Sequence, residues 1–236
     1  MTEPFFRSHV AGLDGVTFDA GLRSFMQRIF SYMGGGLALT GVLAWIVANT
    51  ALAGILFGSP LKYVLMLAPL GFIMVMSFRM NTITVSGLRS LFWLFCGTMG
   101  LSMGSIFLYY TQTSVARAFF ITAGTFGAMS LWGYTTKKNL ADMGSLLIMG
   151  AVGIFIAMLV NMFLASSTLQ WVISVMGVGI FTGLTAWDVQ RLKQTYAEGV
   201  GAESNDKLAI FGALTLYLNF INAFQFLLQL MGDRRS

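Results

Sequence analysis

Near the end of the chain lies an uncharged apolar run, Leu208–Met231, with the sequence LAIFGALTLYLNFINAFQFLLQLM. It exceeds the roughly 20 residues that a helix needs to cross a bilayer core of ~30 Å. Such runs are too evenly apolar for the alternating pattern of barrel strands. The sequence therefore predicts an all-α, polytopic membrane protein, a bundle of seven transmembrane helices. The six earlier runs are Ile29–Asn49, Tyr63–Phe78, Ser90–Tyr110, Ala118–Tyr134, Met143–Leu164 and Leu169–Trp187, and the stretch Ala51–Phe57 is also apolar.

The composition of the 236-residue chain agrees with this fold class. It is 56% hydrophobic and only 10% charged, whereas a soluble domain has about 25% charged residues. We expect residues 1–24 to form a tail outside the membrane and residues 25–236 to form one membrane domain. The tail contains Glu3, Asp14 and Asp19 and lacks the apolar core of a signal peptide. No soluble catalytic domain is expected.

The positions of Lys and Arg predict the orientation, because short cytoplasmic loops are rich in both. Most of the 14 fall on the N-terminal side of the predicted bundle, so we expect a cytoplasmic N-terminus and a C-terminus on the far side. If the last run re-enters the membrane instead, Arg234 and Arg235 also become cytoplasmic. Without a signal peptide or long loops, the chain suits a bacterial inner membrane, with an organelle membrane as the alternative. The N-terminal side holds Arg7, Arg23, Arg28, Arg79, Arg89, Lys137, Lys138, Arg191, Lys193 and Lys207, and the other side holds Lys62, Arg117, Arg234 and Arg235.

Several classes of function conflict with the sequence. Cys96 and His9 are the only residues of their types, too few for a zinc or haem site. A Ser-His-Asp or Cys-His site would need His9 to reach back from the tail. No basic stripe interleaved with aromatics suggests nucleic acid. We expect no enzymatic activity, no resident cofactor, a buried packing role for Cys96, and the lipid bilayer as the surrounding partner.

Asp188 is the one acid outside the tails and loops, at the end of the sixth run. A carboxylate there is costly and is usually paired and often functional. The alternative is an interfacial residue satisfied by water or by Arg191. Arg79, at the same end of the second run, either forms an ion-pair latch with Asp188 across the bundle or snorkels into the headgroups.

The last run carries polar side chains on one face. At 100° per residue, five of them fall within about a third of the helix circumference. Such a face must look into the bundle or a wet cavity, so we favour a polar pathway over simple interhelical hydrogen bonding. The five residues are Thr215, Asn219, Asn222, Gln225 and Gln229.

Two segments carry a family resemblance: Thr185–Gln190, TAWDVQ, and Gly212–Asn222, GALTLYLNFIN. They resemble the closing signature of the transmembrane Bax-inhibitor-motif family. Phe25–Arg28 and Lys137–Leu140 are shorter matches, and the resemblance covers roughly residues 23–232. It implies a bundle whose last helix is central and surrounded by the other six.

The resemblance also implies a pH-sensitive calcium leak in bacterial and organellar members. There, an aspartate on the sixth helix and one on the seventh share a proton and gate the pore. Asp188 matches the first aspartate, but the second position is Asn219. Two adjacent carboxylates cannot both ionise cheaply, whereas the Asn219 amide can donate to ionised Asp188. We therefore expect proton-controlled gating to be weakened or moved to lower pH.

Calcium prefers several charged oxygen ligands, so one carboxylate with amide oxygens and water predicts a transient calcium site at Asp188. The predicted function is a leak channel for calcium or other cations. Members of the family are also thought to modulate a membrane protease or restrain cell death, and the alternative is such a regulator without flux. A secondary transporter, with saturable flux, is a weaker candidate.

Overall fold

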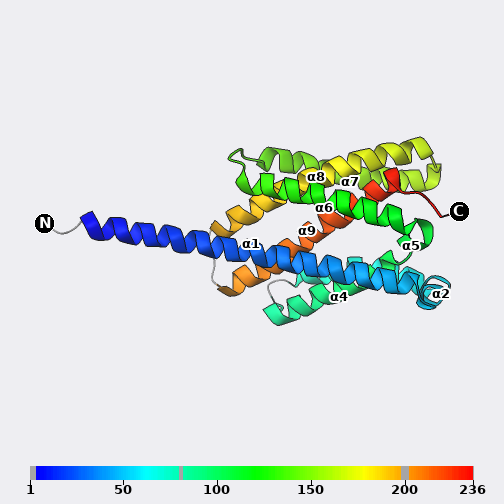
Figure 1. The fold of residues 1–236 in the computed structure, drawn as a ribbon, viewed down its shortest axis with the longest axis horizontal. Helices are drawn as coiled ribbons and strands as arrows, with labels where there is room; N and C mark the ends of the chain where they lie inside the picture. The colour runs from blue at the N-terminus through cyan, green and yellow to red at the C-terminus, as the bar shows by residue number, and fades with distance from the viewer. Residues whose placement is uncertain (1–3, 80–81, 198–201, 236) are drawn as a thin grey trace.

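The computed structural model describes residues 4–79, 82–197 and 202–235 as a bundle of helices (Figure 1). Residues 1–3 of the expected tail lie outside this described part. Seven helical segments are long and apolar enough to span a membrane, which confirms the predicted fold class. The helices are α1 Pro4–Ala48, α2 Leu52–Phe57, α3 Leu61–Phe78, α4 Val85–Met103, α5 Ile106–Tyr109, α6 Gln112–Thr135, α7 Ala141–Leu164, α8 Ser167–Ala197 and α9 Ala202–Met231.

The two short helices correspond to ambiguous parts of the sequence. The apolar stretch after Asn49 forms α2, and the third predicted run is divided into α4 and α5. Threonines mark two of the helix starts, because a threonine hydroxyl can accept a hydrogen bond from a free amide of the first turn. Thr84 caps α4 in this way through the amide of Gly87, and Thr111 caps α6 through the amide of Ser114.

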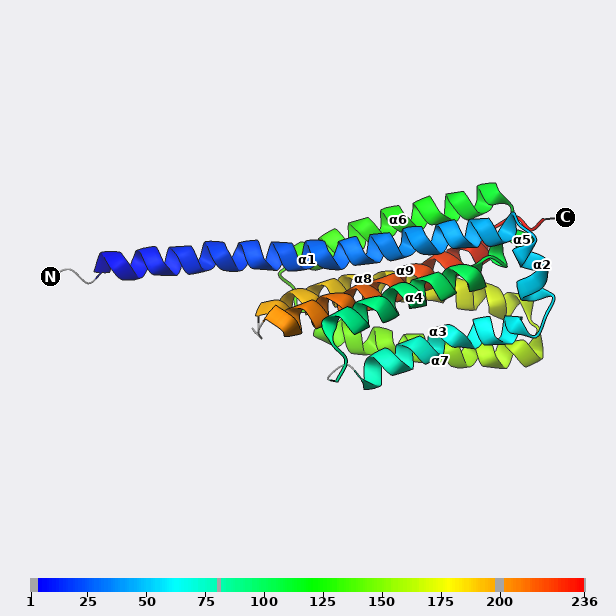
Figure 2. The same cartoon turned by 90° about the horizontal axis from the view of Figure 1, so that it is seen from below.

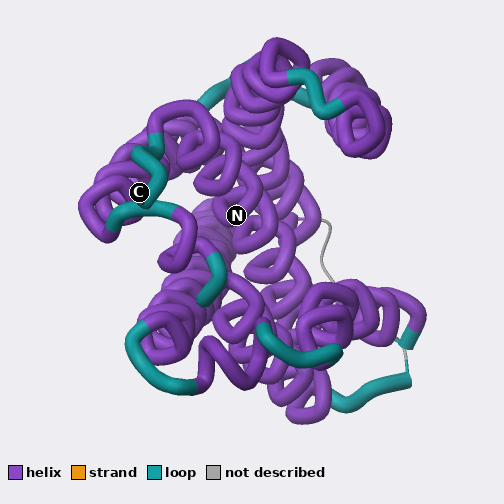
Figure 3. Tube along the Cα trace, turned by 90° about the vertical axis from the view of Figure 1, so that its right-hand side faces the viewer, coloured by secondary structure: helices purple, strands orange, loops and turns teal. Residues whose placement is uncertain are grey.

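The bundle has two ends, which we name by the chain terminus that lies at each (Figures 1 and 2). The N-terminal end holds the last turn of α3, the first turn of α4, the α6–α7 connection, the end of α8 and the start of α9. The C-terminal end holds α2, α5 and the α7–α8 connection; Figure 3 views the bundle from this side. There the amide of Thr111 donates to the Asp233 carbonyl at 3.0 Å, and the amide of Arg235 donates to Tyr109 at 2.9 Å. The last helix therefore crosses the bundle completely and does not re-enter.

Helix α9 is the central element of the bundle. Buried residues make up 67% of its most apolar window, against 11% for α3 and for α7. It packs closely against α1, α4, α6 and α8, while α3 packs on α4 and α7 packs on α8. The expected central helix is thus present, although two of the other six spans lie mainly in an outer layer.

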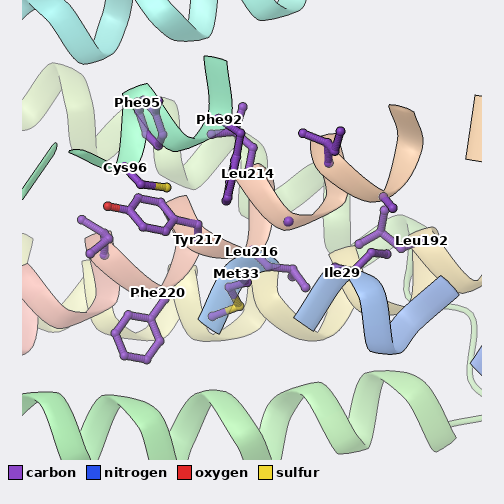
Figure 4. Close-up of a cluster of buried hydrophobic side chains, with 14 of the residues drawn as sticks. Ile29, Met33, Phe92, Phe95, Cys96, Leu192, Leu214, Leu216, Tyr217 and Phe220 are labelled. Atoms are coloured by element: carbon purple, nitrogen blue, oxygen red, sulfur yellow. The ribbon is translucent and has the colours of Figure 1, made fainter. Parts of the chain in front are cut away.

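Aromatic and aliphatic side chains together fill the core between α9, α4 and α1 (Figure 4). Tyr217 is fully buried, with its ring 5.4 Å from that of Phe95. Its hydroxyl lies 2.7 Å from the Thr40 hydroxyl, which donates to the Cys96 carbonyl at 2.9 Å. Cys96 is itself fully buried in this cluster, as expected for a packing cysteine.

Helix α1 joins the tail to the first span without a break. It runs from Pro4 to Ala48, and its first part extends beyond the other helices (Figures 1 and 2). The part that fits a membrane span begins at Ala20. Leu22 and Phe25 are both buried in the main core, so the boundary expected between residues 24 and 25 falls within one helix.

Candidate functional site

Asp188 lies inside a helix and not at its end. The sixth apolar run stops at Trp187, but α8 continues to Ala197. Ala186, two residues before Asp188, and Val189, the residue after it, are fully buried. Asp188 is only 3% exposed, so the structure places its carboxylate within the protein interior.

The structure brings Asp188 and Asn219 together across the α8–α9 interface. The Asn219 side-chain amide donates to Oδ2 of Asp188 at 2.7 Å. Asn219 is 5% exposed, so this contact is shielded from solvent. An amide donor stabilises an ionised carboxylate without adding a second negative charge.

The other oxygen of Asp188 faces Arg191, one turn along α8. Nη2 of Arg191 lies 2.9 Å from Oδ1, while the Arg191 side chain is 48% exposed. The approach is an ion pair outside hydrogen-bond geometry, so Oδ1 has no hydrogen-bond donor among the described residues. The guanidinium also lies 4.5 Å from the centre of the Trp187 ring, a cation–π contact. Arg191 thus covers the carboxylate on the side of the N-terminal end.

Close packing with α6 and α7 encloses the same turn of α8. A side chain at Gly133 of α6 would overlap the main chain of Ala186, and one at Gly144 of α7 would overlap the indole of Trp187. Both positions therefore require glycine for the helices to approach this closely. The turn that carries Asp188 is held between α6, α7 and α9.

Gln190 joins this turn to the α6–α7 connection and Lys193 joins it to the last turn of α6, roles that the sequence did not predict. The Gln190 side chain accepts from the Leu140 amide and donates to the Lys138 carbonyl, both at 2.8 Å. The ammonium of Lys193 donates to the Tyr134 carbonyl at 3.0 Å. The only available signal was that Gln190 and the Lys137–Leu140 segment both belong to the family-like motifs.

Arg79 does not reach Asp188. It lies exposed at the end of α3, and its amide donates to the Val75 carbonyl at 3.1 Å. The described residues give it no ion pair with Asp188, whose charged partner is Arg191. The interpretation of Arg79 as a latch is not supported, because α3 packs on α4, away from the turn that carries Asp188.

The polar side chains of α9 do not share one cavity. Thr215 and Asn222 donate to carbonyls of their own helix at 3.1 and 2.9 Å. Asn222 also borders an apolar cavity of about 390 Å³ between α7, α8 and α9. Gln225 and Gln229 border another, of about 360 Å³, between α3, α4, α5 and α9. The polar face of α9 therefore borders two separate cavities. The sequence had favoured a single polar pathway along this face.

The ligand chemistry near Asp188 is limited. Within the described ranges, no group of three His, Cys, Asp or Glu side chains could hold a metal ion. A cation at Asp188 would depend on one carboxylate, amide and main-chain oxygens, and water. Calcium bound in this way would be held weakly.

Comparisons with known proteins agree with this architecture. A family model described as "Inhibitor of apoptosis-promoting Bax1" matches residues 22–236. An uncharacterized protein of Caulobacter vibrioides is 42% identical over 246 residues, which covers 98% of this chain and 97% of that one. An uncharacterized protein of Rickettsia prowazekii is 41% identical over 221 residues, with coverage of 93% and 94%. The inner membrane protein YbhL of Escherichia coli K12 is 41% identical over 220 residues, with coverage of 92% and 94%. With a family match across nearly all of its spanning helices, the chain belongs to the Bax inhibitor family of integral membrane proteins.

Proposed function

We propose that the protein is a cation leak of the Bax-inhibitor type, which passes calcium and is controlled at Asp188. The observation that carries the proposal is the buried Asp188 carboxylate, held by Asn219 on one oxygen and by Arg191 on the other. A carboxylate inside a membrane span is costly, and such groups commonly line ion pathways. The closed state is the one in which Arg191 neutralises the charge that a passing cation would use.

The contact with Asn219 leads to a specific expectation about pH. In a pair of carboxylates, one must hold a proton, and the pair responds to pH as a unit. Here the amide supplies the hydrogen bond without a proton that can be lost. Control by pH is therefore weaker than in an aspartate pair, or acts at lower pH.

Calcium-dye flux into proteoliposomes of the purified protein tests the proposal. Asp188→Asn keeps the shape of the side chain but removes the negative charge on which a passing cation depends and leaves the positive charge of Arg191 beside the pathway, so calcium flux should fall even though the closing ion pair is lost. The matched control is Asp142→Asn, an exposed acid in the first turn of α7, which should leave the flux unchanged. If Asp142→Asn lowered the flux as much as Asp188→Asn, the assignment of the site would be wrong.

A regulator without flux is the second candidate function. Such a protein would modulate a membrane protease or cell-death signalling, and the family description names apoptosis. The observation that favours it is the extension of α1 beyond the other helices, the segment to which such a partner would bind. Background-level calcium signals from both the unchanged protein and Asp188→Asn would favour this function over the leak.

The orientation belongs to the same proposal. We place the N-terminal end in the cytoplasm, because most of the Lys and Arg residues lie there, and the membrane is a bacterial inner membrane, as for the Escherichia coli relative. Lys137→Cys, in a chain whose Cys96 is replaced by alanine, tests the side. A membrane-impermeant maleimide should label it in inside-out vesicles and not in intact cells; the reverse result would invert the orientation.

A further inference from the structure

Helix α8 carries a line of polar side chains that leads from Asp188 toward the C-terminal end of the bundle. At 100° per residue, these positions fall within about a third of the helix circumference. They face neighbouring helices, so the line lies along the α6–α8–α9 side of the bundle. The residues after Asp188 in this direction are Thr185, Thr182, Ser174 and Gln170.

Four threonines line a small cavity in the middle of this line, which we call the threonine niche. The niche is about 20 Å³ and lies between α6, α8 and α9, enough for about one water molecule. Thr122 and Thr185 donate to carbonyls of their own helices at 2.8 and 2.9 Å, which leaves their oxygens free to accept. The hydroxyl of Thr182 has no hydrogen-bond partner among the described residues. The lining consists of Thr122, Thr125, Phe126, Val178, Thr182, Thr185, Ala223 and Leu227.

An amide cluster lies on the C-terminal side of the niche. Gln170 donates to the Gln229 side chain at 2.5 Å and accepts from Asn161 at 3.1 Å. Ser174 donates to the same oxygen of Gln229 at 3.2 Å. Gln229 also borders the cavity of about 360 Å³ that Gln225 lines. Polar groups of α7, α8 and α9 therefore continue the line to a larger cavity.

Val178 and Leu227 separate the niche from this cluster. Val178 follows Ser174 by one helical turn, about 6 Å along the axis, and both apolar side chains line the niche. On the other side, Thr185 precedes Asp188 by about 4.5 Å. Ser130 of α6 lies one turn beyond Phe126 in the same direction, and its buried hydroxyl has no hydrogen-bond partner among the described residues.

We propose that water and cations move between α6, α8 and α9, from the amide cluster through the threonine niche to Asp188. Val178 and Leu227 form the apolar constriction between the amide cluster and the niche, which closes this path to cations in the conformation described here, since such a constriction gates by excluding water. The passage of cations rests on the proposed leak function, whereas the presence of water in the niche does not. The path follows α8, and not the polar stripe of α9 that the sequence suggested.

Cysteine accessibility tests for water directly, because Cys96 is the only cysteine in the chain. In a Cys96→Ala background, Thr182→Cys is treated with a charged methanethiosulfonate and the product is measured by intact mass. The matched control is Met176→Cys, on the exposed side of α8. When the constriction opens, the reagent reaches position 182 through water, so Thr182→Cys should react at least about tenfold faster than Met176→Cys. The reagent attacks the thiolate, which water stabilises and hydrocarbon does not. Equally slow reaction at both positions would overturn the path.

A second variant tests the constriction without cysteine chemistry. Val178→Thr keeps the side-chain shape and adds a hydroxyl, so the calcium flux should rise at least about fivefold if that hydroxyl makes one ordinary hydrogen bond to a passing water. Val175→Thr, exposed on the same helix, is the control.

The two assays separate the two proposals. A reactive Thr182→Cys in a protein without flux would support the wet path and reject the leak. If the protein passes calcium, Thr182→Cys does not react and Val178→Thr leaves the flux unchanged, the leak is supported and this path is rejected.

Discussion

Replacing Arg191 with glutamine should open the proposed pathway. The substitution removes the positive charge that lies 2.9 Å from Oδ1 of Asp188. It leaves the hydrogen bond from Asn219 to Oδ2 in place. The ion pair is asymmetric, because the Asp188 side chain is 4% exposed whereas that of Arg191 is 48% exposed. Its strength therefore lies between those of a surface pair and a buried pair.

The size of the effect follows from this asymmetry. Two unit charges at this separation attract by about 6 kcal/mol at an effective dielectric constant of 20, but the loss of arginine hydration offsets most of that. Exposed pairs contribute about 0.2–1 kcal/mol, and removing one partner of a buried pair costs about 3–5 kcal/mol. We take about 1–3 kcal/mol for the Asp188–Arg191 pair. If only the closed state contains the pair, the open fraction should rise by about 5- to 150-fold.

Calcium-dye flux in proteoliposomes measures this change. Arg191→Gln should increase the initial rate until the open fraction saturates, and Arg191→Lys, which keeps a charge, should increase it less. Lys137→Gln, an exposed lysine in the α6–α7 connection, controls for the loss of one positive charge at this end of the protein. Its flux should remain close to that of the unchanged protein.

Two results would refute this reasoning. The first is an unchanged flux in an Arg191→Gln protein that has normal thermal stability. The second comes from the double variant: in an Asp188→Asn background there is no ion pair to break, so the gain from Arg191→Gln should shrink. An equal gain in both backgrounds would mean that Arg191 acts on the flux without Asp188.

Three further outcomes follow from described contacts. Asn219→Asp should make any flux more sensitive to pH, because two adjacent carboxylates cannot both ionise cheaply; a flux-against-pH curve identical to that of the unchanged protein would show that the positions do not communicate. Gln190→Ala should lower the free energy of unfolding by about 1–3 kcal/mol, since it leaves two main-chain groups unpaired. Thermal unfolding in detergent measures this, and the exposed Gln194→Ala should show no comparable loss. Gly133→Ala should cost about 1–3 kcal/mol by overpacking against the α8 main chain, whereas Gly127→Ala meets open space on the same helix; equal melting temperatures would contradict the packing argument.

Hydropathy predicted the number of spans but not the full length of α8. Asp188 and the polar residues after it end the apolar run at Trp187, yet the helix continues to Ala197. Helical hydrogen bonds need no apolar side chains, and packing of Val189 and Leu192 into the core holds the extension in place. Hydropathy detects helices that lie in lipid, so it does not detect a polar helical extension that is stabilised by contacts with protein.

The sequence did not decide which arginine is the charged partner of Asp188. Arg79 and Arg191 were both placed on the same side of the membrane, and topology alone does not give the distance between two helices. The spacing of three residues between Asp188 and Arg191 was the better guide, because it brings both side chains to one face of a helix. The Asn219 contact came from the family resemblance, and its geometry came from the α8–α9 packing.

The hydrogen bonds of the Gln190 side chain to the α6–α7 connection could not be predicted from periodicity. Its two partners are main-chain groups of the α6–α7 connection, far away in the sequence. A helical pattern shows which side chains share a face, but it does not show which loop lies opposite. The same limit applies to α9, where Asn222 and Gln225 share a stripe yet border different cavities.

Gln190 holds two main-chain atoms of the α6–α7 connection, and Lys193 holds one in the last turn of α6. The loop, the end of α6 and the turn bearing Asp188 therefore form one mechanical unit. A force that pulls the loop outward must either break these hydrogen bonds or carry the buried carboxylate along with it. The loop is therefore coupled mechanically to Asp188. Its motion reaches Asp188 through the fastened turn, whatever side chains the outer face of the loop carries.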